Sequence, residues 1–523
     1  MASAAILLGA ACSRTQRQED EPFELAEATV ATLRQRLENG QDTAVSLVEK
    51  YLARIESSDR AGPRINSMIE VNPDALVIAQ RLDAERRAGR IRGPLHGVPI
   101  VIKDNIDTAD RMMTTAGSLA MVGAKPLADA PLVTALRTAG VVILAKTNMS
   151  EWAHFRSWSH ATSGWSGRGG LTLNPYALDR STSGSSSGTA AAVSCNLVAI
   201  GIGTDTDGSI VSPSSCCGLV GIRPTVGLVS REGIIPIAQS MDTAGPMART
   251  VTDAVLLLNV MALAAEHDGI AGLSRQAPVH DFAAFLVPDG LRSARIGVVR
   301  EELFGYSPSA DRIAEDALEL LKREGATLVD PANIDTISQL GEPAMELMQY
   351  EFKDGINAYL AGLGPGAPVQ SLADIIAFNV KNEDRELPFF GQETMVAAAE
   401  KGPLTSKEYV FARKQCRDLS RRFGIDAIME KHGLDALVAP SGDPAWVIDL
   451  KNGDGNKGWS STTAAVAGYP HITVPAGYAS GLPVGLSFFG RAWSEPTLIR
   501  LAYAFEQATA QRRPPRFLPT VAV

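Results

Sequence analysis

Two stretches of sequence decide the fold around the candidate site: Ser181-Thr-Ser-Gly-Ser-Ser-Ser-Gly-Thr-Ala-Ala-Ala-Val193 and Gly203-Thr-Asp-Thr-Asp-Gly-Ser-Ile-Val211. Between them, the small residues 189–196 predict a short helix, which advances about 1.5 Å per residue. The apolar run 197–203 predicts a buried strand, which advances about 3.3 Å per residue. The chain runs away from the first stretch along the helix and returns along the strand, so the two stretches should lie close together.

Ser185 and Ser209, 24 residues apart, are therefore expected to meet. Their backbone N–H groups lie in Gly-rich turns and at a helix start, where such groups are free to bind an anion. An alternative reading of the first stretch is a flexible Gly/Ser linker. That reading is weaker because the stretch is short and runs directly into helical and strand patterns.

Lys103 belongs to a third segment of the chain. It follows the apolar run Gly97-Val-Pro-Ile-Val-Ile102, which predicts a buried strand with Pro99 near its start. Polar residues at the end of a buried strand are where α/β folds usually build sites. By its spacing alone, Lys103 is equally well read as a surface lysine beside an ordinary turn.

The rest of the chain alternates between helical and strand patterns, which predicts an α/β fold: one large mixed sheet covered by helices on both faces. A helix-rich stretch at residues 343–431 carries no recognised chemistry and is expected to shape the mouth of the site. Further helices are expected at residues 24–39, 42–57, 73–89, 131–139, 251–263, 309–324 and 495–508, and strands at 141–145, 295–299, 436–439, 472–474 and 484–489.

Bulk composition bounds the class of protein. The chain has 523 residues, of which 45% are hydrophobic, and no linker of biased composition divides it, so we expect a single domain over residues 23–523. Its net charge of −9, with dispersed basic residues, argues against a nucleic-acid surface. No apolar run reaches the roughly 18 to 20 residues that cross a bilayer.

The first 22 residues have a different character. Ala2–Cys12 is short and apolar and is followed by polar residues, which resembles the end of a bacterial export signal with Cys12 as a lipid-attachment site. The positively charged start of such a signal is missing, so a loose terminus is the alternative. The expected location is periplasmic or lipid-anchored through Cys12, and otherwise cytoplasmic.

Histidines and cysteines give weak signals. The seven histidines are scattered without metal-ligand spacing, and the five cysteines form no Cys-x-x-Cys pair. We therefore expect no metal site and no cofactor, and we expect the cysteines to be buried thiols.

The two serine stretches and the Lys103 segment resemble the amidase signature family. The likeness implies Ser209 as nucleophile, Ser185 as a bridging serine preceded by a cis peptide from Gly184, and Lys103 as base. It spans most of residues 25–515. Other similar segments are Ala145–Met149, Cys217–Gly227, Asp242–Arg249, Gly468–Gly477 and Gly481–Gly485.

The departures from the family pattern narrow the resemblance. Ser187 and Asp207 stand where the family usually has Gly, Thr182 where it often has Pro, and Val211 where it usually has Arg. This version is most similar to the bacterial peptide amidase branch, which removes the terminal carboxamide nitrogen from peptide amides.

The implied chemistry is amide hydrolysis through an acyl-enzyme on Ser209, with Ser185 relaying protons to Lys103. Lys103 must be neutral, so burial must lower its pKa by roughly three units. The oxyanion donors are expected among the backbone N–H groups of residues 206–209. The candidate oxyanion or substrate-binding residues are Thr206, Asp207, Gly208 and Ser186.

We expect different roles for the two carboxylates in the second stretch. Asp207, beside the developing negative charge, is expected either to point away or to accept hydrogen bonds from substrate N–H groups. Asp205 is read as a residue that caps the turn, rather than as a catalytic one.

Other functions stay open at this point. Within the family, the substrate could be a small or aryl amide. An α/β-hydrolase esterase would use Ser186 in Gly184-Ser-Ser-Ser-Gly188, together with a downstream histidine such as His432 or His471, but the preceding segment is polar and broken by proline. A partner-dependent amidotransferase subunit is the remaining rival. The Gly-rich tract lacks the Gly-Lys-Ser/Thr ending of a phosphate-binding loop, and the oligomeric state stays open.

Overall fold

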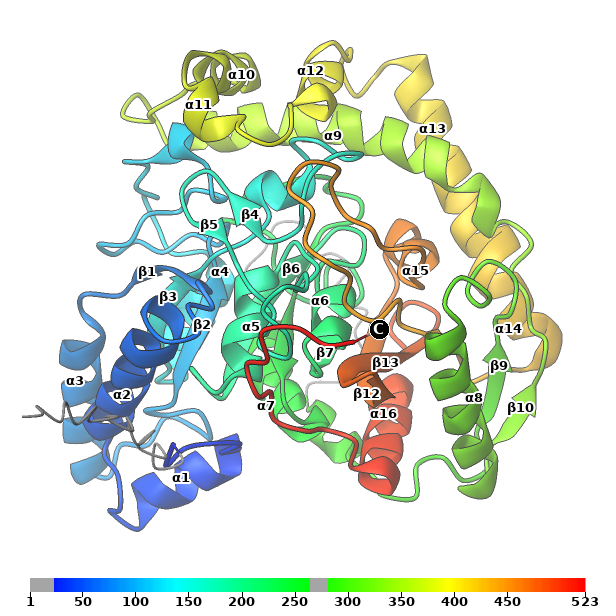
Figure 1. Cartoon of the computed structure of the whole chain (residues 1–523), viewed down its shortest axis with the longest axis horizontal. Coiled ribbons are helices and arrows are strands. Elements are labelled where there is room, and N and C mark those ends of the chain that lie inside the picture. Colours follow the sequence, from blue (N-terminus) through cyan, green and yellow to red (C-terminus); the bar gives the residue numbers. More distant parts are fainter. Residues whose placement is uncertain (1–22, 264–280, 523) are drawn as a thin grey trace, which may run out of the picture.

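The computed structural model describes residues 23–263 and 281–522, and its centre is one mixed sheet of eleven strands (Figure 1). The strand order is β1-β3-β2-β6-β8-β7-β12-β13-β11-β9-β10. The strands are β1 (Met68–Val71), β2 (Pro99–Lys103), β3 (Val142–Thr147), β6 (Ile200–Asp205), β7 (Val220–Arg223), β8 (Thr243–Ala248), β9 (Arg295–Val298), β10 (Thr327–Val329), β11 (Ala436–Pro440), β12 (His471–Ala479) and β13 (Leu482–Phe489).

Strands β2 and β6 position the site. They run parallel to each other, with Val101 opposite Gly201 and Ile102 opposite Ile202. Every residue of both strands is buried, as expected for parallel strands that are covered on both faces. Because the strands are parallel, their carboxyl ends lie at the same edge of the sheet, and Lys103 and Asp205 are their last residues.

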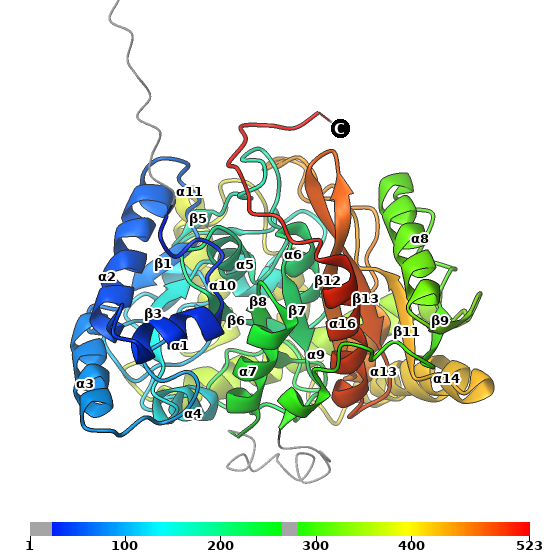
Figure 2. The same ribbon diagram turned by 90° about the horizontal axis from the view of Figure 1, so that it is seen from below.

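Helices pack on both faces of this sheet. Helix α5 packs on β2, β3, β6 and β8, whereas α7 packs on β6, β7 and β8 and against α16. Figure 2 shows α7 and α16 side by side over the middle strands. The helices around the sheet are α1 (Val30–Glu38), α2 (Ala44–Arg54), α3 (Ala75–Arg87), α4 (Pro131–Thr138), α5 (Ser187–Ser194), α6 (Val211–Cys216), α7 (Val251–Ala262), α8 (Pro308–Arg323), α15 (Thr462–Ala467) and α16 (Glu495–Thr509).

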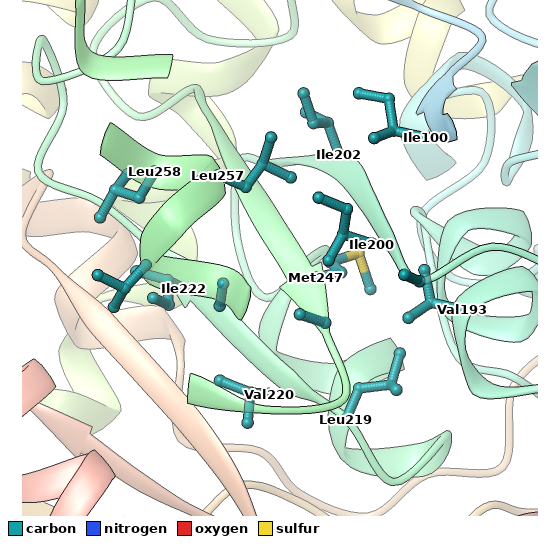
Figure 3. Close-up of a cluster of buried hydrophobic side chains, with 14 of the residues drawn as sticks. Ile100, Val193, Ile200, Ile202, Leu219, Val220, Ile222, Met247, Leu257 and Leu258 are labelled. Carbon is teal, nitrogen blue, oxygen red and sulfur yellow. The ribbon is translucent and has the colours of Figure 1, made fainter. Parts of the chain in front are cut away.

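The main core fills the space between sheet and helices. Figure 3 shows part of it, with Val193 from α5, Ile200 and Ile202 from β6, and Met247 from β8. Each of these side chains is fully buried. At roughly 25 cal/mol per Å² of buried apolar area, such packing is the main favourable term that holds the carboxyl ends of β2 and β6 in place.

The helix-rich stretch forms an arc along the upper and right edge of Figure 1. It has its own apolar core, which includes Met348, Phe352 and Tyr409. Met348 also reaches the candidate site, so the expectation that this stretch shapes the mouth is supported. The arc consists of α9 (Gly341–Gly362), α10 (Leu372–Lys381), α11 (Glu383–Glu386), α12 (Glu393–Ala399), α13 (Lys407–Arg417) and α14 (Asp426–His432).

The predicted α/β fold, with one mixed sheet in a single domain, is confirmed. The helix predicted over residues 24–39 is wrong at its start: it begins at Val30, because the hydroxyl of Thr29 accepts a hydrogen bond from the N–H of Thr32 and caps it. Strands β1, β7, β8 and β10 and the short helix α6 were not predicted.

The export segment and Cys12 lie outside the described residues. The other four cysteines are buried free thiols, as expected. No helix within residues 23–263 and 281–522 is both long and apolar enough to span a bilayer.

Candidate active site

Lys103 lies at the carboxyl end of β2 and is fully buried. Its Nζ donates hydrogen bonds to Ser185 Oγ at 2.7 Å, to Thr204 Oγ1 at 2.8 Å and to the Thr204 carbonyl at 3.3 Å. Asn105 Nδ2 donates to the same Thr204 Oγ1 at 3.0 Å. The lysine is therefore aimed at Ser185 and is not a surface residue beside a turn.

Burial changes the acidity of this lysine. Desolvation lowers the pKa of Lys103 to about 7, and the negative charges of Asp205 and Asp242 offset only part of that effect. This agrees with the expected fall of roughly three units. A substantial fraction of the amine is therefore neutral near pH 7, which is the form that can accept a proton.

The two serine stretches meet as expected. The N–H of Ser186 donates to the carbonyl of Ser209 at 3.3 Å, and the peptide between Gly184 and Ser185 is cis. Ser185 and Ser209 both line a cavity of about 160 Å³. Ser185 is fully buried, whereas Ser209 is 9% exposed, so Ser209 is the more accessible of the two hydroxyls.

Ser186 has a structural position. Its fully buried hydroxyl donates to the Thr204 carbonyl at 3.0 Å and accepts from the Thr204 N–H at 3.2 Å. It does not line the cavity. Both of these contacts join the start of α5 to β6, which counts against Ser186 as an esterase nucleophile.

The turn after β6 is held by Asp205. Its carboxylate accepts from the N–H of Gly208 at 3.0 Å and of Ile210 at 2.7 Å, and it forms a buried ion pair with Arg223 at 2.6 Å. The expected turn-capping role of Asp205 is thus what the structure shows. Gly208 has φ +86°, and a Cβ there would lie 2.6 Å from Ser461 Oγ, so both the backbone and the neighbouring α15 require glycine.

The N–H of Gly208 is used by Asp205, which removes it from the expected oxyanion donors. The N–H groups of Asp207 and Ser209 have no acceptor within the part of the chain that the structure describes. The side chain of Thr206 is held by another partner: its hydroxyl donates a hydrogen bond to Asp242 at 2.6 Å. The backbone N–H groups of Asp207 and Ser209 are therefore free donors next to the Ser209 hydroxyl.

The side chain of Asp207 lines the cavity and is held by two residues that are distant from it in the sequence. Its carboxylate accepts from Ser461 Oγ at 2.8 Å and from Thr462 Oγ1 at 2.9 Å. Burial raises the pKa of Asp207 to about 6. Sequence reasoning missed Ser461 and Thr462, which lie 254 and 255 residues away from Asp207 in the chain.

Sequence reasoning also missed the outer wall of the cavity. Trp158, Trp446 and Trp459 line it together with Asp454, whose carboxylate accepts from the N–H and hydroxyl of Ser163. These residues come from two loops that carry no recognisable motif. Three of the six tryptophans of the chain gather here, which is the one compositional signal that could have pointed to them.

The two downstream histidines are not near the serines. His471 is fully buried in β12 and stacks on Phe489, and burial lowers its pKa to about 3. His432 ends α14. Neither lines the cavity, so neither His432 nor His471 can pair with its serines.

Known proteins resemble this chain over most of its length. Residues 46–499 match the sequence profile of the Amidase family. A probable amidase from Arabidopsis thaliana is 40% identical over 520 residues, covering 97% of this chain and 94% of that protein. The A subunit of glutamyl-tRNA(Gln) amidotransferase from Chloroflexus aggregans is 34% identical, covering 93% of this chain and 97% of that subunit.

Among solved structures, native peptide amidase from Stenotrophomonas maltophilia is 48% identical and superimposes with a TM-score of 0.89. The match covers 95% of this chain and all of that one. The chain therefore belongs to the amidase signature family and is a hydrolase that acts on amides.

Proposed function

We propose that this amidase removes ammonia from the C-terminal carboxamide of peptides, with Ser209 as nucleophile, Ser185 as proton relay and Lys103 as base. The observation that carries this proposal is the 2.7 Å hydrogen bond between Lys103 Nζ and Ser185 Oγ at a fully buried site. The 48% identity to a peptide amidase supports the choice of substrate.

In the acylation step, Ser209 Oγ attacks the carboxamide carbon and gives its proton to Ser185, which passes its own proton to neutral Lys103. The carbonyl oxygen becomes an oxyanion. When the C–N bond breaks, the leaving nitrogen takes the proton back through Ser185 and departs as ammonia. Water then attacks the ester along the same proton route, which releases the peptide acid and restores Ser209.

The oxyanion accepts hydrogen bonds from the N–H groups of Asp207 and Ser209. Loss of one such donor typically costs about 10² to 10³ in rate. The ion pair of Asp205 with Arg223 keeps the turn in shape, because Asp205 holds both Gly208 and Ile210.

A substrate panel on the purified chain tests this function. Ammonia release is measured from a blocked dipeptide carboxamide and from the free amide of its last amino acid, and aniline release is measured from the matching anilide. We expect the peptide carboxamide to have the highest kcat/KM. Faster release from the free amide or the anilide would overturn the peptide assignment and leave the family assignment intact.

The amidotransferase relatives suggest one alternative: a subunit that hands ammonia to a partner. The same panel separates the two functions. Turnover of the peptide carboxamide by the purified chain alone favours the hydrolase. Activity that appears only in the presence of another protein would favour the subunit.

A further inference from the structure

The charged side chains around the active-site cavity all have one sign. Asp207 and Asp454 are the carboxylates among its lining residues, and no lysine or arginine within the described part of the chain lines it. His154 also lines the cavity, but burial lowers its pKa, so it is neutral near pH 7. The cavity therefore presents two negative charges beside the nucleophile.

Neither carboxylate has a cationic partner. Within 4 Å, no ion pair joins Asp207 or Asp454 to a lysine, arginine or histidine of residues 23–263 and 281–522, whereas nearby Asp205 is paired with Arg223 at 2.6 Å. Both carboxylates are satisfied by hydrogen bonds from neutral groups alone. Half-buried carboxylates of this kind are stabilised further when a cation comes close.

Indole rings complete the cavity wall beside each carboxylate. Trp446 Nε1 donates to Asp454 at 3.1 Å. Trp459 Nε1 donates at 2.8 Å to Thr462 Oγ1, which donates in turn to Asp207. Trp158 is the third ring, and it is 37% exposed. Indole faces attract organic cations, and Trp does so best among the aromatic residues.

Positively charged side chains line a separate groove of about 1,020 Å³ between α9, α13 and α15. Its lining includes Arg413, Lys414, Arg417 and Arg421. The negative sign of the active-site cavity is therefore local and does not simply follow the net charge of −9.

We infer that the active-site cavity selects substrates by an organic cation carried on the residue that bears the carboxamide. The inference rests on the proposed function and specifies its substrate class. The cavity of about 160 Å³ is smaller than the roughly 300 to 1,000 Å³ that hold whole drug-sized molecules, so it suits one substrate residue. The cation is a lysine-like or arginine-like side chain.

Three amides test the inference and separate a side-chain cation from an α-ammonium. N-acetyl-lysine amide carries a side-chain cation, N-acetyl-norleucine amide is its neutral counterpart, and unblocked norleucine amide carries only the α-ammonium. With the full chain at pH 8, we expect kcat/KM for N-acetyl-lysine amide to exceed that of N-acetyl-norleucine amide by about tenfold or more.

Two variants locate the effect. Asp454→Asn and Asp207→Asn keep the side-chain shape and remove the charge, and each is expected to lower the cationic-to-neutral ratio several-fold. The matched control is Glu430→Gln, which removes an exposed negative charge from α14 outside the cavity and should leave the ratio unchanged. Because both substrates are measured on one preparation, a partly unfolded variant lowers both rates and leaves the ratio intact.

A ratio near one in the unmodified protein would overturn the inference, as would a high ratio that neither variant lowers. A preference for unblocked norleucine amide alone would overturn both this inference and the peptide assignment, because the C-terminal residue of a peptide has no α-ammonium. A preference for N-acetyl-lysine amide assigns the cation to the side chain. Equal ammonia release from all three amides would contradict this inference and leave the proposed function intact. No release from any of the amides would contradict the proposed function.

Discussion

The two walls of the active-site cavity differ in origin and in exposure. The serine wall, formed by residues 183–185, 206, 208, 209 and 212, comes from the turns that flank one helix and one strand, and it is almost entirely buried. The indole wall, formed by Trp158, Trp446, Asp454 and Trp459 and completed by the carboxylate of Asp207, comes mainly from loops nearly 300 residues apart and is partly exposed. From this difference we expect bond breaking to depend on the serine wall and substrate choice on the indole wall.

This division can be tested by changing one wall at a time. Changes in the serine wall should alter turnover of every amide by a similar factor. Changes in the indole wall should alter the ratio between amides.

The largest expected effect is that of Lys103→Ala. Without the base, no group accepts the proton of Ser185, and kcat should fall at least about 10³-fold on every amide. Steady-state ammonia release measures it, with circular dichroism to verify folding. Lys125→Ala, an exposed lysine, is the control and should keep full activity. Undiminished turnover in Lys103→Ala would break the account of the serine wall.

Gly208→Ala should have the next largest effect on activity. Its Cβ would lie 2.6 Å from Ser461 Oγ, so the turn must shift and displace the donors of Asp207 and Ser209, at a cost of about 10² to 10³ in kcat. Gly481→Ala is a matched control, because Gly481 has the same φ of +86° but no atom within 4 Å of such a Cβ. Equal activity losses in the two variants would show that the contact with Ser461 is irrelevant.

The pH dependence of turnover should be somewhat smaller. The pKa of Lys103 is lowered to about 7, so the neutral base is lost as the pH falls below 7. For N-acetyl-norleucine amide, which does not titrate, kcat/KM should fall about tenfold per pH unit below 7 and level off above 8. A profile that is flat between pH 5 and 8 would contradict a lysine base.

Selectivity should also depend on pH, but only several-fold. The pKa of Asp207 is raised to about 6 by burial, so Asp207 takes up a proton below pH 6 and loses its attraction for a cation. The groups that face it are Ser461 and Thr462, with Asp205 and Arg223 farther away. The cationic-to-neutral ratio should therefore be lower at pH 5 than at pH 8, and an unchanged ratio would remove Asp207 from the selecting wall.

The smallest expected effect is that of His432→Gln. His432 lies in α14 and does not line the cavity, so ammonia release should stay within about twofold of the unmodified protein, in the range of an ordinary surface substitution. A large loss would revive a histidine-dependent mechanism.

Sequence reasoning reached the serine wall because its geometry is local. The small residues of α5 and the apolar residues of β6 set a helix and a strand whose lengths bring Ser185 to Ser209. The buried run of β2 likewise delivers Lys103 to the same sheet edge. The periodicity of these elements is visible in the sequence, and their caps moved the predicted ends by only a few residues.

The missed parts have different physical reasons. Strand β8 contains Gly245 and Pro246, which normally argue against a strand; Pro246 pairs only with Ile202 of β6, because the pairing with β7 covers only Met247 and Ala248. The contacts of Asp207 with Ser461 and Thr462, and the gathering of three tryptophans, depend on loops placed by the whole sheet. No local pattern encodes such contacts.

The most direct test of the central claim is to trap the acyl-enzyme. The protein is mixed with a good amide substrate, quenched in acid within the first turnover and digested, and the added acyl mass is located by mass spectrometry. The account predicts the adduct on Ser209. An adduct on Ser186 or on any other residue, with none on Ser209, would contradict it.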